Sequence, residues 1–216
     1  MDASLIENMK HINEKFGPFY PYLAKQMHET LQRARRGCGG DGRAGGAALE
    51  IGPYALGISL ALAELCSDYA ITIVDDEPAM LEQFRRDLAG HPRARQITIT
   101  EGDKYNLPFP ANSFDLIFFR GALFFWERQG RILAEIHRTL KPGGVGIAGG
   151  GFGNDAPNDL IEEHLPVLRD LNRRLYKKIL AIEEVRDIIA QAGLQERARL
   201  TRKHGLWIEI TKETAP

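Results

Sequence analysis

Hydrophobic residues follow two alternating patterns along most of the chain. Short apolar runs with little internal alternation, such as Ala47–Gly52 and Phe114–Phe119, predict strands that are buried on both faces of a sheet. Between such runs, apolar residues recur every three or four positions, as they do from Met80 to Leu88, and this spacing predicts helices. Strand–helix alternation of this kind predicts an α/β fold with a doubly wound, mostly parallel sheet.

Seven strands are expected, and the last two differ from the rest. The expected strands are Ala47–Gly52, Ala70–Val74, Gln96–Thr100, Phe114–Phe119, Val145–Ala148, Gln195–Leu200 and Leu206–Thr211. The final pair should form an antiparallel hairpin around His204 and Gly205. Helices are expected over Gly57–Cys66, Met80–Leu88, Ile132–Leu140, Asp159–Asn172 and Val185–Ala192. Pro166 could interrupt the fourth of these helices.

The first 46 residues differ in composition from the remainder. Residues 1–36 predict two helices, separated near Gly17–Pro18, with an aromatic corner at Phe19–Tyr22 that either packs on the core or covers a substrate pocket. Six of the ten residues from 37 to 46 are glycine, which is typical of a linker. We therefore expect a single domain with a helical cap (1–36), a glycine-rich linker (37–46) and an α/β core (47–216).

Composition and charge narrow the classes of partner. The 216 residues suit one domain, and a net charge of -1 gives no electrostatic reason to expect nucleic acid or an anionic membrane. No apolar stretch approaches the roughly 20 residues needed to span a bilayer. Cys38 and Cys66 have no metal-binding spacing, so no metal site is expected, and reduced thiols would suit a cytoplasmic protein.

Acidic and glycine residues stand where the parallel strands are expected to end. In an open α/β sheet, ligands bind outside the carboxyl ends of the strands. The residues at these ends are Glu50, Gly52, Asp75, Asp76, Gly102, Asp103, Lys104 and Arg120. Asp75 could accept both hydroxyls of a ribose, whereas Asp103 could accept an adenine amino group or simply cap a turn. The order of these residues favours a nucleotide-type ligand.

The ordered motifs resemble the class I S-adenosylmethionine-dependent methyltransferases, over nearly everything from Ala47 to Phe152. Leu49–Gly52 is similar to the family's first motif, whose carboxylate helps orient the methionine amino group. Val74–Leu81 resembles the second, whose first acid binds the ribose, and Glu101–Asp115 resembles the third, whose aspartate reads the adenine. Glu135–Gly144 is similar to the turn that precedes the fifth strand.

The resemblance implies a Rossmann-like fold, S-adenosyl-L-methionine as the cofactor, and methyl transfer to an unidentified small-molecule acceptor. Two segments, 120–127 and 149–154, narrow it to a small, largely uncharacterised prokaryotic subgroup of type 11-like methyltransferases. The implied cofactor-binding residues are Glu50, Gly52, Pro53, Tyr54, Asp75, Asp76, Gly102, Asp103, Lys104 and Arg120. The expected substrate-facing residues are Tyr20, Phe125, Trp126 and Phe152, for each of which core packing is the alternative.

Tyr54 and Leu56 depart from the family pattern, which usually carries small residues, mostly glycine, at these positions. A non-glycine residue held at positive φ costs on the order of 1–2 kcal/mol. Either the loop bends differently, with Gly57 taking the flexible position, or the affinity for the cofactor is reduced.

No catalytic residue is assigned. The leaving group of a sulfonium needs no protonation, so a base is required only if the acceptor must lose a proton. His28, His137 and His164 are candidates by residue type alone, and none lies in a recognisable catalytic motif.

Two other functions remain open. The first is a non-catalytic binding or interaction protein on the same fold, which Tyr54 and Leu56 favour. The second is an NAD-type oxidoreductase, because Gly52 and Gly57 match the outer glycines of a G-x-G-x-x-G fingerprint.

Overall fold

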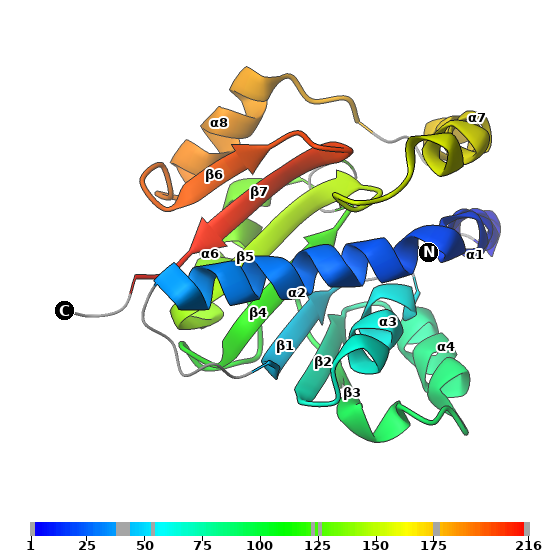
Figure 1. Cartoon of the computed structure of the whole chain (residues 1–216), viewed down its shortest axis with the longest axis horizontal. Helices are drawn as coiled ribbons and strands as arrows, with labels where there is room; N and C mark the ends of the chain where they lie inside the picture. Colours follow the sequence, from blue (N-terminus) through cyan, green and yellow to red (C-terminus); the bar gives the residue numbers. More distant parts are fainter. Residues whose placement is uncertain are drawn as a thin grey trace.

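The computed structural model describes residues 3–37, 44–52, 55–121, 124, 127–174 and 178–213. One seven-stranded sheet with the order β3-β2-β1-β4-β5-β7-β6 forms its centre (Figure 1). The strands are β1 (Gly46–Ile51), β2 (Tyr69–Asp75), β3 (Ile97–Glu101), β4 (Phe114–Arg120), β5 (Leu140–Gly151), β6 (Ala198–Thr201) and β7 (Gly205–Thr211). Strands β1 to β5 pair in parallel, and β7 pairs antiparallel with both β5 and β6. The predicted doubly wound sheet with an antiparallel C-terminal hairpin is confirmed.

Helices cover both faces of the sheet. They are α1 (Ala3–Phe16), α2 (Tyr20–Gly37), α3 (Gly57–Leu65), α4 (Pro78–Leu88), α6 (Gln129–Thr139), α7 (Asn158–Arg174) and α8 (Ile182–Gln191), with short 3-10 turns η1 (Gly17–Phe19) and η2 (Ala94–Gln96). The apolar sides of α2, α3 and α4 share one core cluster, and those of α6 and α8 share the other. Helices α1 and α7 lie beyond the carboxyl ends of the parallel strands (Figure 1). Among the described residues, no helix combines the length and apolar character that crossing a membrane requires.

The segment Lys141–Gly144 belongs to β5 and not to a separate turn before it. The pairing of β4 with β5 jumps from Phe114–Leu140 to Leu116–Val145, which marks a bulge. Gly143 has a φ of 76°, and its N–H donates to the Lys212 carbonyl over 2.7 Å. The strand that we expected to begin at Val145 is therefore longer, because residues beyond β7 hold the bulge in the sheet.

Pro166 does not interrupt α7. Proline cannot donate to the carbonyl of residue i−4, here Glu162. Glu162 is exposed, so water can reach this end of the turn, while Leu168 and Leu171 beyond the proline are buried in the core. Packing on both sides of Pro166 thus outweighs the missing hydrogen bond.

Asp115 ties the end of α2 to the beginning of the sheet. Its carboxylate accepts hydrogen bonds from Arg35 at 3.0 Å, Lys141 at 2.8 Å and the Ala47 N–H at 2.9 Å. Arg35 also donates to the Gly45 carbonyl over 2.7 Å. Burial acts to raise the pKa of Asp115, but these donors outweigh it and the pKa lies below its ordinary value. Helix α2 is thereby fixed on the sheet at the first residues of β1. Residues 38–43 of the predicted linker lie outside the described residues.

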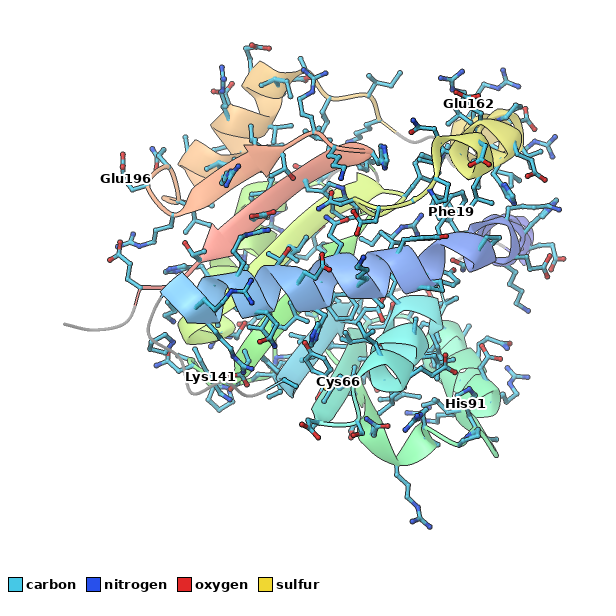
Figure 2. All side chains as sticks on the ribbon, in the orientation of Figure 1. Phe19, Cys66, His91, Lys141, Glu162 and Glu196 are labelled. Atoms are coloured by element: carbon cyan, nitrogen blue, oxygen red, sulfur yellow. The ribbon has the colours of Figure 1, made fainter. Side chains whose placement is uncertain are left out.

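Phe19, the first residue of the aromatic corner, packs in the core. It is fully buried where α1, α2 and α7 meet (Figure 2). Its ring centroid lies 5.7 Å from that of Phe16, 4.8 Å from that of Phe152 and 5.4 Å from that of His164. Phe19 is a core residue and does not form a lid.

Candidate functional site

The carboxyl ends of β1 to β4 bring most of the predicted cofactor residues to one edge of the sheet. The Gly52 N–H donates to the Val74 carbonyl over 2.8 Å, and the Gly102 N–H donates to the Asp75 carbonyl over 3.0 Å. A Cβ atom added to Gly52 would lie 3.9 Å from the Asp75 carboxylate. The three strand ends are therefore in direct contact. The strand-end site, as we call it, comprises Glu50, Gly52, Asp75, Asp76, Gly102, Asp103, Lys104 and Arg120.

Glu50 is a buried carboxyl group, with 2% of its surface exposed. The Ser59 hydroxyl, from α3, donates to it over 2.5 Å. Burial raises the pKa of Glu50 to about 8, against the opposing influence of the Ser59 hydrogen bond and the positive charge of Arg120. No salt bridge among the described residues involves Glu50. A cationic ligand group placed beside this carboxyl would lower its pKa and favour its ionised form.

The turn after β1 depends on Gly52. Its φ of 52° lies in the left-handed region that favours glycine. Leu56, by contrast, has a φ of -76°, is 2% exposed, and accepts the Leu60 N–H at the beginning of α3. Leu56 thus needs no glycine. Pro53 and Tyr54 lie outside the described residues.

One alternative from the sequence was that Gly57 takes the flexible position of the loop in place of the usual glycines. This alternative is wrong. Gly57 is the first residue of α3, and its φ is not positive. A Cβ atom at Gly57 would overlap the ring of Tyr20. The lack of a side chain at Gly57 is therefore explained by the aromatic ring of α2 that lies against it.

The end of β2 presents two acids with different partners. Asp75 is 8% exposed and accepts the Glu77 N–H over 2.8 Å, while burial raises its pKa to about 6. Asp76 accepts Lys104 over 2.5 Å, and Lys104 itself is 4% exposed. The Asp76–Lys104 pair joins the loop after β2 to the loop after β3.

Asp103 caps a turn. Its side chain accepts the Tyr105 N–H over 2.8 Å and its carbonyl accepts the Asn106 N–H over 3.1 Å. The side chain is exposed, so the second oxygen can meet a ligand.

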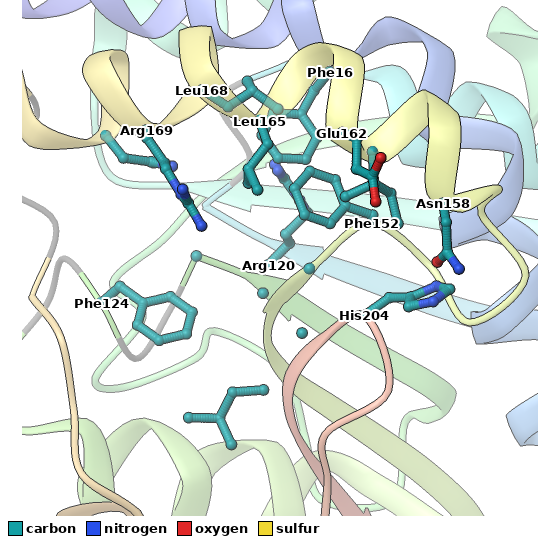
Figure 3. Close-up of a pocket in the computed structure, with 17 residues that line it drawn as sticks. Phe16, Arg120, Phe124, Phe152, Asn158, Glu162, Leu165, Leu168, Arg169 and His204 are labelled. Carbon is teal, nitrogen blue, oxygen red and sulfur yellow. The ribbon is translucent and has the colours of Figure 1, made fainter.

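Arg120 connects the strand-end site to a cavity. Its guanidinium carbon lies 3.6 Å from the centroid of the Phe16 ring, a stacking contact. The charge of Arg120 acts on both Glu50 and Tyr20. Arg120 also lines a cavity of about 480 Å³, the front cavity (Figure 3).

The front cavity lies between α7, the ends of β4 and β5, and the turn before β7. Its apolar lining is Phe16, Phe124, Phe152, Ile161, Leu165, Leu168 and Leu206, and its polar lining is Arg120, Asn158, Glu162, Arg169, Asn172 and His204. Figure 3 shows the aromatic rings in the middle, with Arg169 and His204 at opposite ends. The remaining wall is glycine backbone from residues 121, 150, 151 and 205.

The two predicted substrate-facing residues that the structure describes lie in different cavities. Phe152 lines the front cavity. Tyr20 instead lines a second cavity of about 530 Å³, between α1, α2 and α4. Its hydroxyl donates to the Asn13 side chain over 3.0 Å, and burial raises its pKa to about 12. Phe125 and Trp126 lie outside the described residues.

Most of the polar lining carries no signal in the sequence. Arg169, Glu162 and Asn158 come from α7, whose pattern predicts only an apolar face, and His204 is recognisable only as a turn residue. The histidines that are candidates by residue type lie elsewhere: the ring of His28 contacts the Tyr69 hydroxyl, that of His164 packs on Phe19, and His137 belongs to α6. Within the described ranges, no group of three or more His, Cys, Asp or Glu side chains could hold a metal ion.

Comparison with known proteins agrees with this geometry. A family model described as a methyltransferase domain matches residues 49–148. A solved structure from Methanococcus maripaludis, described as a candidate S-adenosyl-L-methionine-dependent methyltransferase, is 29% identical, covers 98% of this chain and 93% of its own, and has a TM-score of 0.76. A structure of PigF with SAH, at 23% identity, covers 77% of this chain and 50% of its own with a TM-score of 0.59, a likeness of fold alone.

Curated relatives match over a shorter region. Demethylmenaquinone methyltransferase of Symbiobacterium thermophilum is 39% identical over 82 residues, which are 38% of this chain and 33% of that protein. The first curated relatives are matched over only 20–34% of their length. The methyltransferase prediction is confirmed in preference to the NAD-type alternative: the family model and the relatives support a class I S-adenosylmethionine-dependent methyltransferase.

Proposed function

We propose that this protein transfers a methyl group from S-adenosyl-L-methionine to a small-molecule acceptor bound in the front cavity. The position of Arg120 carries the proposal. This residue lines the front cavity, and its charge also reaches Glu50 in the strand-end site. The cofactor's methionine portion and the acceptor would therefore meet at the end of β4.

The strand-end site has the chemistry that this cofactor requires. A methionine portion carries an ammonium and a carboxylate, which match the buried Glu50 and the cationic Arg120. Asp75 would accept the ribose hydroxyls, and the exposed oxygen of Asp103 would face the adenine. The backbone at Gly52 and Gly102 would allow the cofactor to approach closely. We assign the remaining contacts with the cofactor to Asp76, Lys104, Pro53 and Tyr54.

The protein's contribution to the reaction would be positioning. The bound cofactor supplies an activated methyl group. Glu50 and Arg120 would fix the methionine portion at one end, so that the acceptor approaches from the front cavity in line with the breaking bond. Phe16, Phe124 and Phe152 would exclude water from this approach.

The cavity suits an acceptor with an apolar body. Its volume of about 480 Å³ falls within the range of small-molecule sites, roughly 300–1,000 Å³. Three aromatic and four aliphatic side chains line it. The demethylmenaquinone methyltransferase relative, by its name, acts on demethylmenaquinone, which supports a small-molecule acceptor here.

Isothermal titration calorimetry with S-adenosylhomocysteine and, separately, NADH tests the proposal. We expect binding of the first and none of the second. Glu50→Gln should weaken binding by about tenfold or more, because a charged hydrogen bond to the ammonium is lost. Glu64→Gln, at an exposed position of the same helix as Ser59, is the matched control and should change nothing. Absence of S-adenosylhomocysteine binding would refute the cofactor assignment.

A non-catalytic role on the same fold is the second candidate, and Tyr54 is the feature that favours it. Leu56 no longer supports it, because its φ is ordinary. Tyr54→Gly should strengthen S-adenosylhomocysteine binding if the ring obstructs the site. Unchanged affinity would remove obstruction as an explanation.

We also propose that cap and core form one domain, since Arg35 of α2 pairs with Asp115 of β4 over 3.0 Å. A single cooperative unfolding transition is expected, and two separated transitions would contradict it.

A further inference from the structure

We propose that His204 is the catalytic proton acceptor, and that the acceptor molecule is therefore an apolar ring compound bearing an acidic hydroxyl group. The inference rests on the proposed methyl transfer and identifies the substrate class of that same front cavity. His204 lies in the turn between β6 and β7, far in sequence from the strand-end site.

Two contacts fix His204 to the segment that follows β5. Its backbone carbonyl accepts the Phe152 N–H over 3.0 Å. Its ring nitrogen Nδ1 lies 3.2 Å from the Gly153 carbonyl oxygen. The backbone of His204 is in the left-handed region, with a φ of 49°, a conformation that is uncommon for a residue other than glycine.

The Gly153 contact decides which ring nitrogen can accept a proton. A carbonyl oxygen can only accept a hydrogen bond, so Nδ1 must carry the hydrogen. In the neutral ring, Nε2 then has the free lone pair. His204 lines the front cavity and lies at the end opposite Arg169 (Figure 3).

Gly153 is itself held in place. Its φ is 94°, and a Cβ atom there would lie only 2.7–2.8 Å from the backbone and Cβ of Tyr22 in α2. The carbonyl that orients the imidazole is therefore part of a rigid contact between α2 and the end of β5. The ring is positioned before any ligand arrives.

The remaining lining selects the class of acceptor. The rings of Phe16 and Phe152 stack with centroids 5.6 Å apart and an interplanar angle of 11°, and Phe124 lines the same cavity. These side chains favour a flat apolar body. Two cations, Arg120 and Arg169, line the cavity against one anion, Glu162. This balance disfavours an ammonium group and favours a hydroxyl group that becomes negative as it reacts.

The step balances as a substitution. The acceptor O–H bond breaks and its proton moves to Nε2 of His204. The oxygen electron pair forms a bond to the methyl carbon, while the carbon–sulfur bond of the cofactor breaks and its electron pair stays on sulfur. The products are a methyl ether, S-adenosylhomocysteine and an imidazolium that returns its proton to water.

Two naphthalene probes test the inference on the full chain saturated with S-adenosylhomocysteine. 1-Naphthol carries the hydroxyl group, and 1-methoxynaphthalene lacks its proton. By calorimetry, 1-naphthol should bind about tenfold more tightly, the usual effect of one hydrogen bond in a partly buried site. In ¹⁵N spectra of histidine-labelled protein, His204 should show a protonated Nδ1, and its Nε2 signal should move toward the protonated position with 1-naphthol only.

His204→Asn separates a catalytic role from a structural one. Asparagine tolerates the left-handed backbone and can still donate to Gly153, but it has no equivalent of Nε2. We expect this variant to lose the preference for 1-naphthol and to keep its affinity for S-adenosylhomocysteine within twofold. His11→Asn, at an exposed position of α1, is the control and should keep the preference.

Equal affinity for the two probes, no binding of 1-naphthol, an unmoved Nε2 signal, or a preference that survives His204→Asn would each overturn the inference. None of these results would affect the cofactor assignment of the proposed function, which fails if S-adenosylhomocysteine does not bind.

Discussion

Replacing Glu50 by glutamine should stabilise the free protein while it weakens cofactor binding. The substitution keeps the shape of the side chain and an oxygen that can accept from Ser59 Oγ, which lies 2.5 Å from the Glu50 carboxyl group. It removes the ionisable group that burial holds neutral. Glutamine is uncharged at every pH, so the comparison isolates the free energy that ionisation of Glu50 contributes.

The magnitude follows from the difference between the folded and unfolded pKa. The pKa of Glu50 is 4.5 in its ordinary state and about 8 in the folded protein, where burial raises it. As pH rises above 4.5, the unfolded chain releases this proton and is stabilised, whereas the folded chain keeps it until the pH passes 8. The wild-type protein therefore loses stability through this window. At pH 7 the loss is about 3 kcal/mol, and at pH 5 it is under about 1 kcal/mol.

Urea unfolding of wild type and Glu50→Gln at pH 5 and pH 7 measures this difference. We expect the variant to gain about 3 kcal/mol at pH 7, which corresponds to a Tm higher by roughly 6–12 °C, and little at pH 5. The exposed control Glu64→Gln should show no such dependence on pH. An equal effect of Glu50→Gln at both pH values would refute the reasoning, because a change in packing alone does not titrate.

Three further substitutions test separate parts of the structure. Gly57→Ala should destabilise the protein by about 1–3 kcal/mol, because the added methyl group overlaps the Tyr20 ring. In the double variant, Tyr20→Ala should remove most of this effect, and additive losses in thermal unfolding would contradict the contact. Asp115→Asn should lower the free energy of unfolding by about 1–3 kcal/mol at pH 7, and the difference from wild type should shrink as pH falls through the lowered pKa of Asp115. A difference in urea unfolding that stays constant down to acid pH would count against the carboxylate network. Asp75→Asn should weaken S-adenosylhomocysteine binding about tenfold at pH 8. At pH values below 6 the affinity of the wild-type protein should decrease, because Asp75 takes up a proton. Calorimetry that shows equal affinities of variant and wild type at pH 8 would exclude Asp75 from the site.

The sequence was sufficient for the parts of the fold that local patterns determine. Buried strands such as Phe114–Arg120 are recognisable by a run of apolar residues, here Leu116–Phe119. Because parallel strands end at the same edge of a sheet, the acids and glycines at their ends could be predicted to lie together. The bulge at Lys141–Gly144 was missed because its hydrogen bonds come from Lys212, some seventy residues away. The residues Lys141–Gly144 suit a turn before the strand and a bulge within it equally well, so their sequence alone does not distinguish the two.

The front cavity could not be predicted for the same physical reason. Arg169 and Glu162 occupy the polar side of an amphipathic helix, where most residues simply face water. His204 is one residue of a hairpin turn, and only its contacts with Phe152 and Gly153 give it a defined orientation. Such residues acquire chemical meaning from tertiary neighbours that no local pattern records.

Gly57 shows why a fingerprint can mislead when it is separated from its neighbours. In a dinucleotide-binding loop, glycines allow the backbone to approach a pyrophosphate at the N-terminus of a helix. Here Gly57 does occupy the first position of α3, but the ring of Tyr20 lies against it, and of the two glycines only Gly52 has the left-handed φ. The spacing from Gly52 to Gly57 therefore combines two unrelated requirements, one for a turn and one for packing beneath α2. The glycine that suggested a nicotinamide cofactor is instead a consequence of the helical cap, which places Tyr20, hydrogen-bonded to Asn13 of α1, within electrostatic reach of Glu50.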